Sequence, residues 1–293
     1  MKFVKKFKTE LQFNNFTLDE NNTPNVSLIE ELYATGGIVY TSFIQSGHDY
    51  SQDYFTIEAI DNIDIILYYS STFNDQDEEE PIGVMYYSTN NGSTWNEMNN
   101  SVSLSAGDKI MFKGIPTTCL GSAGSTINIT NGDNGMIEGR FNIEGNIMSL
   151  IYGDNFVGQT EFPQETETVS WYYVFYSLFA GQENLISAGN LILPVTTLVD
   201  HCYSYMFGNC TSLTTAPELP TATLVEGCYE AMFSGCTSLN YIKCLATDIS
   251  AEYCTDSWMS DVPASGTFIK ASNMNDWTTG DSGIPSGWTV QNA

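Results

Sequence analysis

Between residues 51 and 160, short apolar runs alternate with clusters of Gly, Asn, Asp and Ser. Within the runs, apolar and polar residues alternate one by one, as at Val102/Leu104 and Ile127/Ile129, which is the period of a half-buried β-strand. About seven such strands separated by turn residues favour an antiparallel β-sandwich. The predicted strands are Phe55–Ile60, Ile63–Tyr69, Ile82–Ser88, Val102–Leu104, Ile110–Lys113, Ile127–Thr130 and Arg140–Ile143.

The first 50 residues have too few apolar positions to form a stable core of their own. A short helix is predicted over Lys6–Phe16, and Asn25–Ile29 with Gly37–Tyr40 predicts a two-stranded hairpin. A segment of this kind docks either on its own chain or on a partner, so we expect residues 1–50 to act as a docking or anchor module.

The strongest pattern begins at residue 202, where the chain repeats itself. Residues 202–227, CYSYMFGNCTSLTTAPELPTATLVEG, align without a gap with residues 228–253, CYEAMFSGCTSLNYIKCLATDISAEY, so each unit has 26 residues. A divergent copy precedes them at 174–201, and Cys254 opens a degenerate one. A fixed period of this length predicts a solenoid, in which each repeat packs on its neighbours and the same inward positions recur as a ladder.

Positions that coincide between the two units are predicted to form this inward ladder. Its Met and Phe residues are expected on one side of a short helical turn, and its Leu residues at the start of a short extended segment. The ladder comprises Met206, Phe207, Leu213, Met232, Phe233, Leu239, Cys202, Cys228, Cys210 and Cys236.

The chain is therefore predicted to be mainly β. An anchor module at 1–50 is followed by a β-sandwich at 51–160 and by leucine-rich-repeat-like units at 161–253. Bulky residues after 253, among them Trp258, are expected to cap the open end of the solenoid over 254–293.

The repeat motifs also carry a resemblance. CYxxMFxxCTSL, APELPTATL and the closing NYIKCLATDIS…WTTGDSGIPSGWTVQ resemble the leucine-rich-repeat-like surface proteins of gut Bacteroidota and of the phages that infect them, over roughly residues 145–293. More loosely, the segment from Phe7 to Glu30 resembles an N-terminal module of structural proteins of such phages, the crAss-like phages included. The resemblance implies adhesion or virion structure, and it supplies no catalytic residues.

The net charge of the chain limits the kinds of partner that it is expected to bind. The chain has 9 basic and 35 acidic residues, a net charge of −26, and four of its lysines lie within the first eight positions. Such a surface repels phosphate backbones and anionic membranes, so we expect no nucleic-acid partner and no membrane insertion. Neither a secretory signal nor a run of about 18 apolar residues is found, so a virion protein assembled in the host cytoplasm is expected.

The cysteines and histidines do not form a recognisable metal motif. Of seven cysteines none is in a Cys-x-x-Cys pair, and the only histidines are His48 and His201. Zinc sites need closely spaced ligand pairs, so no metal and no cofactor are expected. The cysteines are interpreted as small buried apolar residues, with disulfides between stacked equivalents as the alternative.

One local motif resembles a turn found in sialidases. Residues 88–95, STNNGSTW, resemble the Asp-box hairpin with Asn90 in place of the usual Asp. We interpret this single copy as a structural turn, pinned by side-chain hydrogen bonds and a packed Trp95. A Ser-His or Cys-His pair for nucleophilic catalysis is not supported by two isolated histidines.

Together these patterns predict a non-enzymatic phage virion protein, a head or tail fibre or decoration protein, that projects its repeats for adhesion. Its anchor module would contact other virion proteins, and a homo-oligomer, with three copies as a guess, is expected. The alternative is an exported bacterial cell-surface adhesin, and a third is a carbohydrate-binding or glycoside-active protein. Tyr203, Tyr229 and Tyr241 are candidate contacts for a host glycan, with buried packing as the other interpretation.

Overall fold

The protein divides into two compact units, Met1–Asp49 and Tyr50–Ala293. In this computed structural model the described residues are 4–6, 10–12, 48–69, 72–73, 79–80, 83–116, 127–130, 136–165 and 171–293.

In the first unit, β1 (Val4–Lys6) and β2 (Glu10–Gln12) pair antiparallel, with Lys6 in register with Glu10. These strands stand where a helix was predicted over Lys6–Phe16. Opposite charges in cross-strand register favour the paired arrangement over a short isolated helix. The hairpin predicted within residues 25–40 lies outside the described residues.

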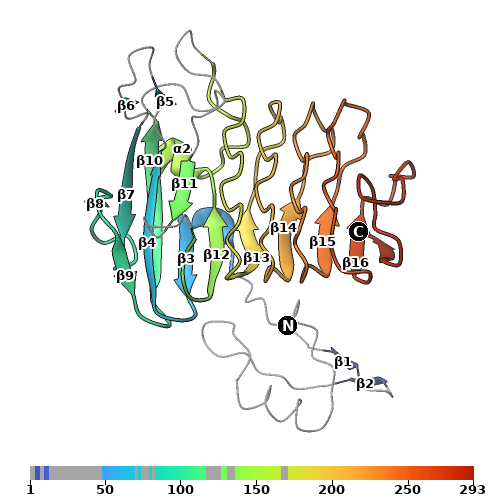
Figure 1. The fold of residues 1–293 in the computed structure, drawn as a ribbon, viewed down its shortest axis with the longest axis horizontal. Coiled ribbons are helices and arrows are strands. Elements are labelled where there is room, and N and C mark those ends of the chain that lie inside the picture. Colours follow the sequence, from blue (N-terminus) through green and yellow to red (C-terminus); the bar gives the residue numbers. More distant parts are fainter. Residues whose placement is uncertain are drawn as a thin grey trace. The chain divides into compact units, whose positions relative to one another are not determined.

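The second unit is built on one ten-stranded sheet, with the order β17-β16-β15-β14-β13-β12-β3-β10-β7-β8 (Figure 1). From β8 to β12 every neighbouring pair is antiparallel, and from β12 to β17 every pair is parallel. The sheet therefore runs without a break past residue 160, where the predicted sandwich meets the predicted repeats. Its strands are β3 (Phe55–Ala59), β7 (Gly83–Ser88), β8 (Asn96–Glu97), β10 (Lys109–Pro116), β12 (Phe141–Asn146), β13 (Leu185–Ile192), β14 (Thr215–Leu219), β15 (Tyr241–Cys244), β16 (Thr267–Lys270) and β17 (Thr289–Asn292).

A smaller sheet, β11 (Ile127–Thr130), β4 (Ile63–Tyr69) and β9 (Val102–Leu104), completes the antiparallel part. Ile65 and Leu67 of β4 are fully buried and belong to the same apolar cluster as the inward residues of the large sheet. The prediction of a mainly β fold is confirmed. The remaining elements are β5 (Thr72–Phe73), β6 (Glu79–Glu80), η2 (Tyr50–Gln52), α2 (Ser149–Tyr152) and η3 (Gly153–Asn155).

The parallel strands belong to a β-solenoid of about four turns with a spacing of about 26 residues. Thr215, Tyr241 and Thr267 are in register on consecutive strands, at the period of the sequence repeat. The predicted repeat architecture is therefore confirmed at the level of the fold.

Opposite the strands, each coil forms a run of consecutive tight turns, which we call the turn ladder (171–182, 199–210, 225–236 and 251–261). Alternate main-chain N–H groups bond within the coil and to the next coil. Ser204 N, for example, donates to His201 O at 3.1 Å, whereas Tyr203 N donates to Cys228 O, also at 3.1 Å. Every fourth residue has a positive φ, as at His201 (55°) and Tyr205 (57°), which is typical of type II turns.

The turn ladder replaces the helical turn that the Met and Phe positions predicted. A helix would use every N–H within its own coil and leave none for the neighbour. The ladder instead buries two adjacent residues in every four, such as Cys202–Tyr203 and Met206–Phe207, and ties the coils together through the main chain. This arrangement stabilises a stack of coils that no single coil could maintain alone.

Candidate functional site

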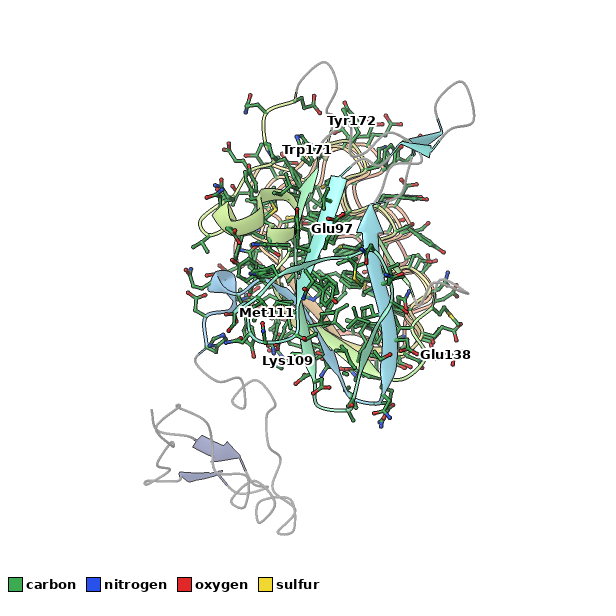
Figure 2. All side chains as sticks on the ribbon, turned by 90° about the vertical axis from the view of Figure 1, so that its left-hand side faces the viewer. Glu97, Lys109, Met111, Glu138, Trp171 and Tyr172 are labelled. Carbon is green, nitrogen blue, oxygen red and sulfur yellow. The ribbon has the colours of Figure 1, made fainter. Side chains whose placement is uncertain are left out.

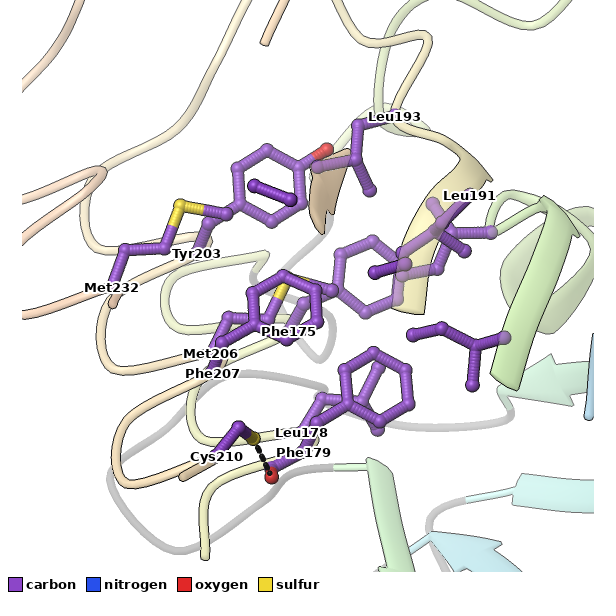
Figure 3. Packing of buried hydrophobic residues seen from close by; sticks show 14 of the residues in the cluster. Phe175, Leu178, Phe179, Leu191, Leu193, Tyr203, Met206, Phe207, Cys210 and Met232 are labelled. Atoms are coloured by element: carbon purple, nitrogen blue, oxygen red, sulfur yellow. Dashed lines mark hydrogen bonds between the residues drawn. The ribbon is translucent and has the colours of Figure 1, made fainter. Parts of the chain in front are cut away.

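All ten residues of the predicted inward ladder have zero solvent exposure. Phe207 lies between Phe179 and Phe233, with ring centroids 5.3 and 5.5 Å away and nearly parallel planes. Figure 3 shows Phe179 and Phe207 together with Met206 and Cys210 in the interior of the coils. These side chains therefore serve as the packed interior of the coils and are not accessible from the surface.

Tyr203 and Tyr229, two of the three candidate glycan contacts, are also buried, with only 1% of each exposed. Their rings stack 6.2 Å apart in a second column that continues to Trp258. Burial raises the pKa of both phenols well above the ordinary value. Neither ring can stack on a sugar, so these two residues are withdrawn as contacts. Tyr241 is partly exposed on β15.

The six cysteines from Cys202 to Cys254 are free and buried. Cys210 and Cys236 donate their thiols to Phe179 O and Phe207 O, each at 3.0 Å. Burial raises the pKa of Cys202 to about 12, so its reactive thiolate form is scarce at neutral pH. In this structure the cysteines serve as packing residues.

The outward face of the turn ladder carries exposed aromatic side chains, which we call the tyrosine face. Tyr172, Tyr176 and Tyr253 are 45%, 38% and 55% exposed. Figure 2 looks along the sheet from its β8 end, with Tyr172 at the first coil of the ladder. The face comprises Tyr172, Tyr173, Tyr176, His201, Tyr205 and Tyr253.

Several of these rings are held by contacts within a coil or with the next coil. Tyr173 stacks on His201 at 4.6 Å with an interplanar angle of 10°, and Tyr176 packs edge-on against Tyr173. Tyr205 accepts a hydrogen bond from Asn209 Nδ2 at 2.7 Å. The aromatic groups are therefore preorganised for contact, which lowers the entropic cost of binding.

Carboxylates surround the tyrosine face. The charge and the hydrogen bond of Asp200 raise the pKa of Tyr172, and a hydrogen bond and the charge of Glu252 do the same for Tyr253. His201 Nδ1 lies 3.3 Å from Glu230 Oε2, close enough for an ion pair but without the geometry of a hydrogen bond. The surface thus combines stacking rings with hydrogen-bond acceptors, a composition suited to binding.

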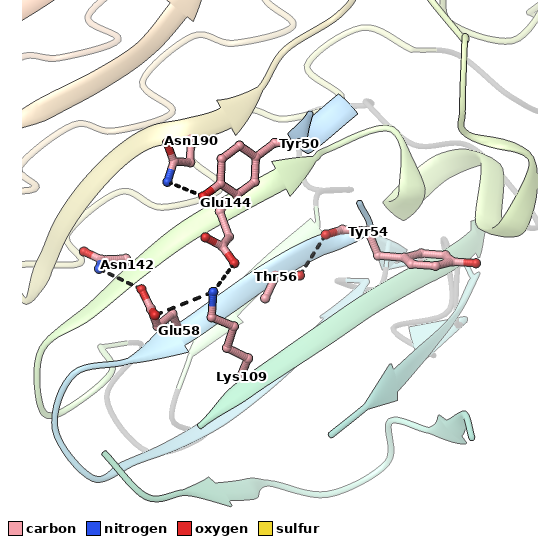
Figure 4. A network of polar contacts seen from close by, with 8 residues as sticks. All are labelled: Tyr50, Tyr54, Thr56, Glu58, Lys109, Asn142, Glu144 and Asn190. Atoms are coloured by element: carbon pink, nitrogen blue, oxygen red, sulfur yellow. Dashed lines mark hydrogen bonds and ion pairs between the residues drawn. The ribbon is translucent and has the colours of Figure 1, made fainter. Parts of the chain in front are cut away.

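A second polar cluster lies on the outward face of the large sheet (Figure 4). Lys109 Nζ lies 2.6 Å from Glu144 Oε1 and 3.6 Å from Glu58 Oε1, and Asn142 Nδ2 donates to Glu58 at 3.1 Å. Partial burial acts to lower the pKa of Lys109, but the hydrogen bond and charge of Glu144 outweigh it. The ammonium therefore stands between the two carboxylates.

The Asp-box-like hairpin is held by its own side chains. Asn90 Oδ1 accepts from Ser88 Oγ at 2.9 Å and from Thr94 N at 3.0 Å, while Asn90 Nδ2 donates to Thr94 Oγ1 at 2.8 Å. Gly92 lies at the turn with a φ of 74°. The structure therefore shows the hydrogen-bonded turn that the sequence predicted.

Trp95 anchors this hairpin on the sheet. Lys113 Nζ lies 4.4 Å above its ring, and the ring of Tyr54 packs 4.7 Å away. Asp154 joins the group by an ion pair with Lys113 at 2.7 Å and by a hydrogen bond from Tyr54 Oη at 2.8 Å. The basic side chain is satisfied within this cluster.

In the described parts of the chain, no group of three or more His, Cys, Asp or Glu side chains is placed to hold a metal ion. No helix in those parts has the length and apolar character needed to span a bilayer. Comparison with known proteins gives no match to a family model, a curated protein or a solved structure.

Proposed function

We propose that this protein is a non-enzymatic binding component of a phage virion, a head or tail fibre or decoration protein, whose repeats contact the host surface. The repeat motifs support the virion assignment through their resemblance to surface proteins of gut Bacteroidota and their phages. The tyrosine face supports the binding role, and it is the observation that carries the proposal.

The coils divide their side chains between a buried interior and an exposed outward face. Interior positions are fully occupied, and the main chain is hydrogen-bonded from coil to coil, so the solenoid is a rigid support. The exposed rings lie outside that filled interior, and Tyr253 keeps 55% of its surface in water. Exposed aromatic groups on a rigid scaffold are characteristic of interaction surfaces.

Residues 1–50 would attach the protein to other virion proteins, within a symmetric homo-oligomer for which three copies are the working assumption. The alternative proposal is an exported bacterial adhesin that uses the same tyrosine face. The two proposals differ in what carries the protein, a phage particle or a bacterial cell surface. Both use the same binding surface.

The binding role is tested with fluorescently labelled protein on intact cells of gut Bacteroidota strains. A variant with Tyr172→Ala, Tyr176→Ala and Tyr253→Ala should fold normally and lose at least tenfold in cell binding, since aromatic anchors dominate interface energetics. Ile115→Ala, at an exposed apolar residue of β10 in the antiparallel part of the sheet, is the matched control. Equal binding by the triple variant and the parent would refute the proposed surface.

A further inference from the structure

The C-terminal cap contains a cavity of about 310 Å³ that the repeats do not share. Two indoles, Trp277 and Trp288, form its walls. Polar groups lie among them: the Lys270 ammonium, the Asn275 amide and the Ser286 hydroxyl. Its volume is at the lower end of that of ligand pockets, which is suited to one small cyclic ligand and not to an extended chain.

The two indole walls are fixed before any ligand arrives. Trp277 stacks on Trp258 at 5.3 Å with an interplanar angle of 5° and meets Phe268 edge-on. Trp288 donates Nε1 to Pro263 O at 2.8 Å. Trp258 covers one face of Trp277, which is only partly buried and lines the cavity.

The ring of Trp288 is also held in place by close packing. Its ring lies against Gly266, where an added Cβ would stand 2.7 Å from the ring atoms. Because both walls are ordered by the cap itself, a ligand would lose little affinity to rearrangement of the protein.

Lys270 places a positive charge beside the cavity of this acidic chain. Its Nζ donates to Met274 O at 2.6 Å and lies 3.5 Å from Ala271 O. In the described ion pairs, each of the other lysines pairs with a carboxylate. Lys243, for example, lies 2.9 Å from Glu218. Among the described residues, no carboxylate pairs with Lys270. On a chain with a net charge of −26, this ammonium is a local positive centre beside two aromatic walls.

We propose that this cavity binds a single pyranose residue of a surface glycan, with preference for a sugar that carries a carboxylate. The inference rests on the proposed function, since it names the ligand class of a surface-binding protein. An indole face packs against the apolar C–H face of a pyranose, and the amide and hydroxyl groups provide hydrogen bonds to its hydroxyls. The Lys270 ammonium would form a charge-assisted hydrogen bond with the carboxylate.

The test is saturation-transfer NMR of the full chain with methyl glycosides of neutral pyranoses and of uronic acids. Saturation of sugar-ring protons is expected, with uronates bound about tenfold more tightly than the matching neutral sugars. Lys270→Met should remove this preference and retain the neutral binding. Ser286→Trp, which fills the cavity from its exposed rim, should abolish both without removing a core contact.

Ile115→Ala, at an exposed apolar residue of β10 outside both the cavity and the tyrosine face, is the control and should change neither. Absence of saturation for every glycoside, or unchanged binding in Ser286→Trp, would overturn the inference. Cell binding without glycoside binding would refute the cavity alone. Glycoside binding without cell binding would refute the proposed function and leave the cavity standing.

Discussion

The structure of the turn ladder predicts a loss of stability when Gly227 is substituted. This residue has a φ of 57°. The equivalent position in the neighbouring coils is occupied by His201 and by Tyr253, both at a φ of 55°, so the backbone itself tolerates a side chain. Gly227 is distinguished by what lies beneath it. A Cβ there would stand 2.1 Å from His201 Nδ1 and 2.2 Å from its Cε1, far inside van der Waals contact.

Gly227→Ala should therefore destabilise the protein in two ways. The left-handed conformation disfavours Ala by about 1–2 kcal/mol. The His201 ring must also move off Tyr173, which forfeits a stack of roughly 0.5–1.5 kcal/mol. The expected loss is about 2–3 kcal/mol, or a fall in Tm of roughly 5–10 °C for a unit of this size.

Chemical denaturation followed by circular dichroism measures this loss, and two variants separate its parts. Gly181→Ala has a φ of 74° but nothing within 4 Å of its Cβ, so only the backbone loss of about 1 kcal/mol is expected. The double variant with His201→Ala should recover the steric part. If the losses of Gly227→Ala and His201→Ala simply add in the double variant, the proposed clash is refuted.

Phe207→Ala should destabilise the protein by about 3–5 kcal/mol in the same denaturation assay, because the ring is fully buried between two others; a loss below about 1 kcal/mol would contradict the packing. Asn90→Ala should destabilise its hairpin by about 1–3 kcal/mol, whereas Asn90→Asp keeps the acceptor for Thr94 N and should be close to neutral. Hydrogen bonds from Arg140 hold the pKa of Asp61 at about 2, below its unfolded value, so its contribution to stability is present above about pH 4 and is lost as the pH falls towards 2. The stability difference between the parent and Asp61→Asn should accordingly shrink over that window, and a constant difference would exclude the ion pair as its source.

The sequence predicted the repeats well because a solenoid places the same inward position at the same spacing in each coil. Met206 and Met232 coincide in the alignment and are both fully buried. The turn ladder could not be predicted in the same way. Apolar pairs every four residues resemble a helical period over so short a segment, and the left-handed positions hold His201 and Tyr205 where glycine would have been a signal.

Other features depend on contacts that a single sequence does not display. The burial of Tyr203 could have been inferred from its place beside Cys202 in the alignment of the two repeat units. A tyrosine ring, however, also occurs at surfaces, where its hydroxyl group contacts water. The cavity of the cap is formed by Trp277 and Trp288, which have no equivalents in the repeats and so no register from which to place them. The continuous sheet arises from parallel pairing of β12 with β13, which is a tertiary contact between distant segments.

Quantitative mass spectrometry of gradient-purified phage particles is the measurement that decides whether this protein is a virion component. We expect recovery of the full chain in a fixed ratio to the major capsid protein, and that ratio would indicate its site and symmetry on the particle. Absence from the particles, with recovery in the outer-membrane fraction of the host, would contradict the claim and favour the exported adhesin.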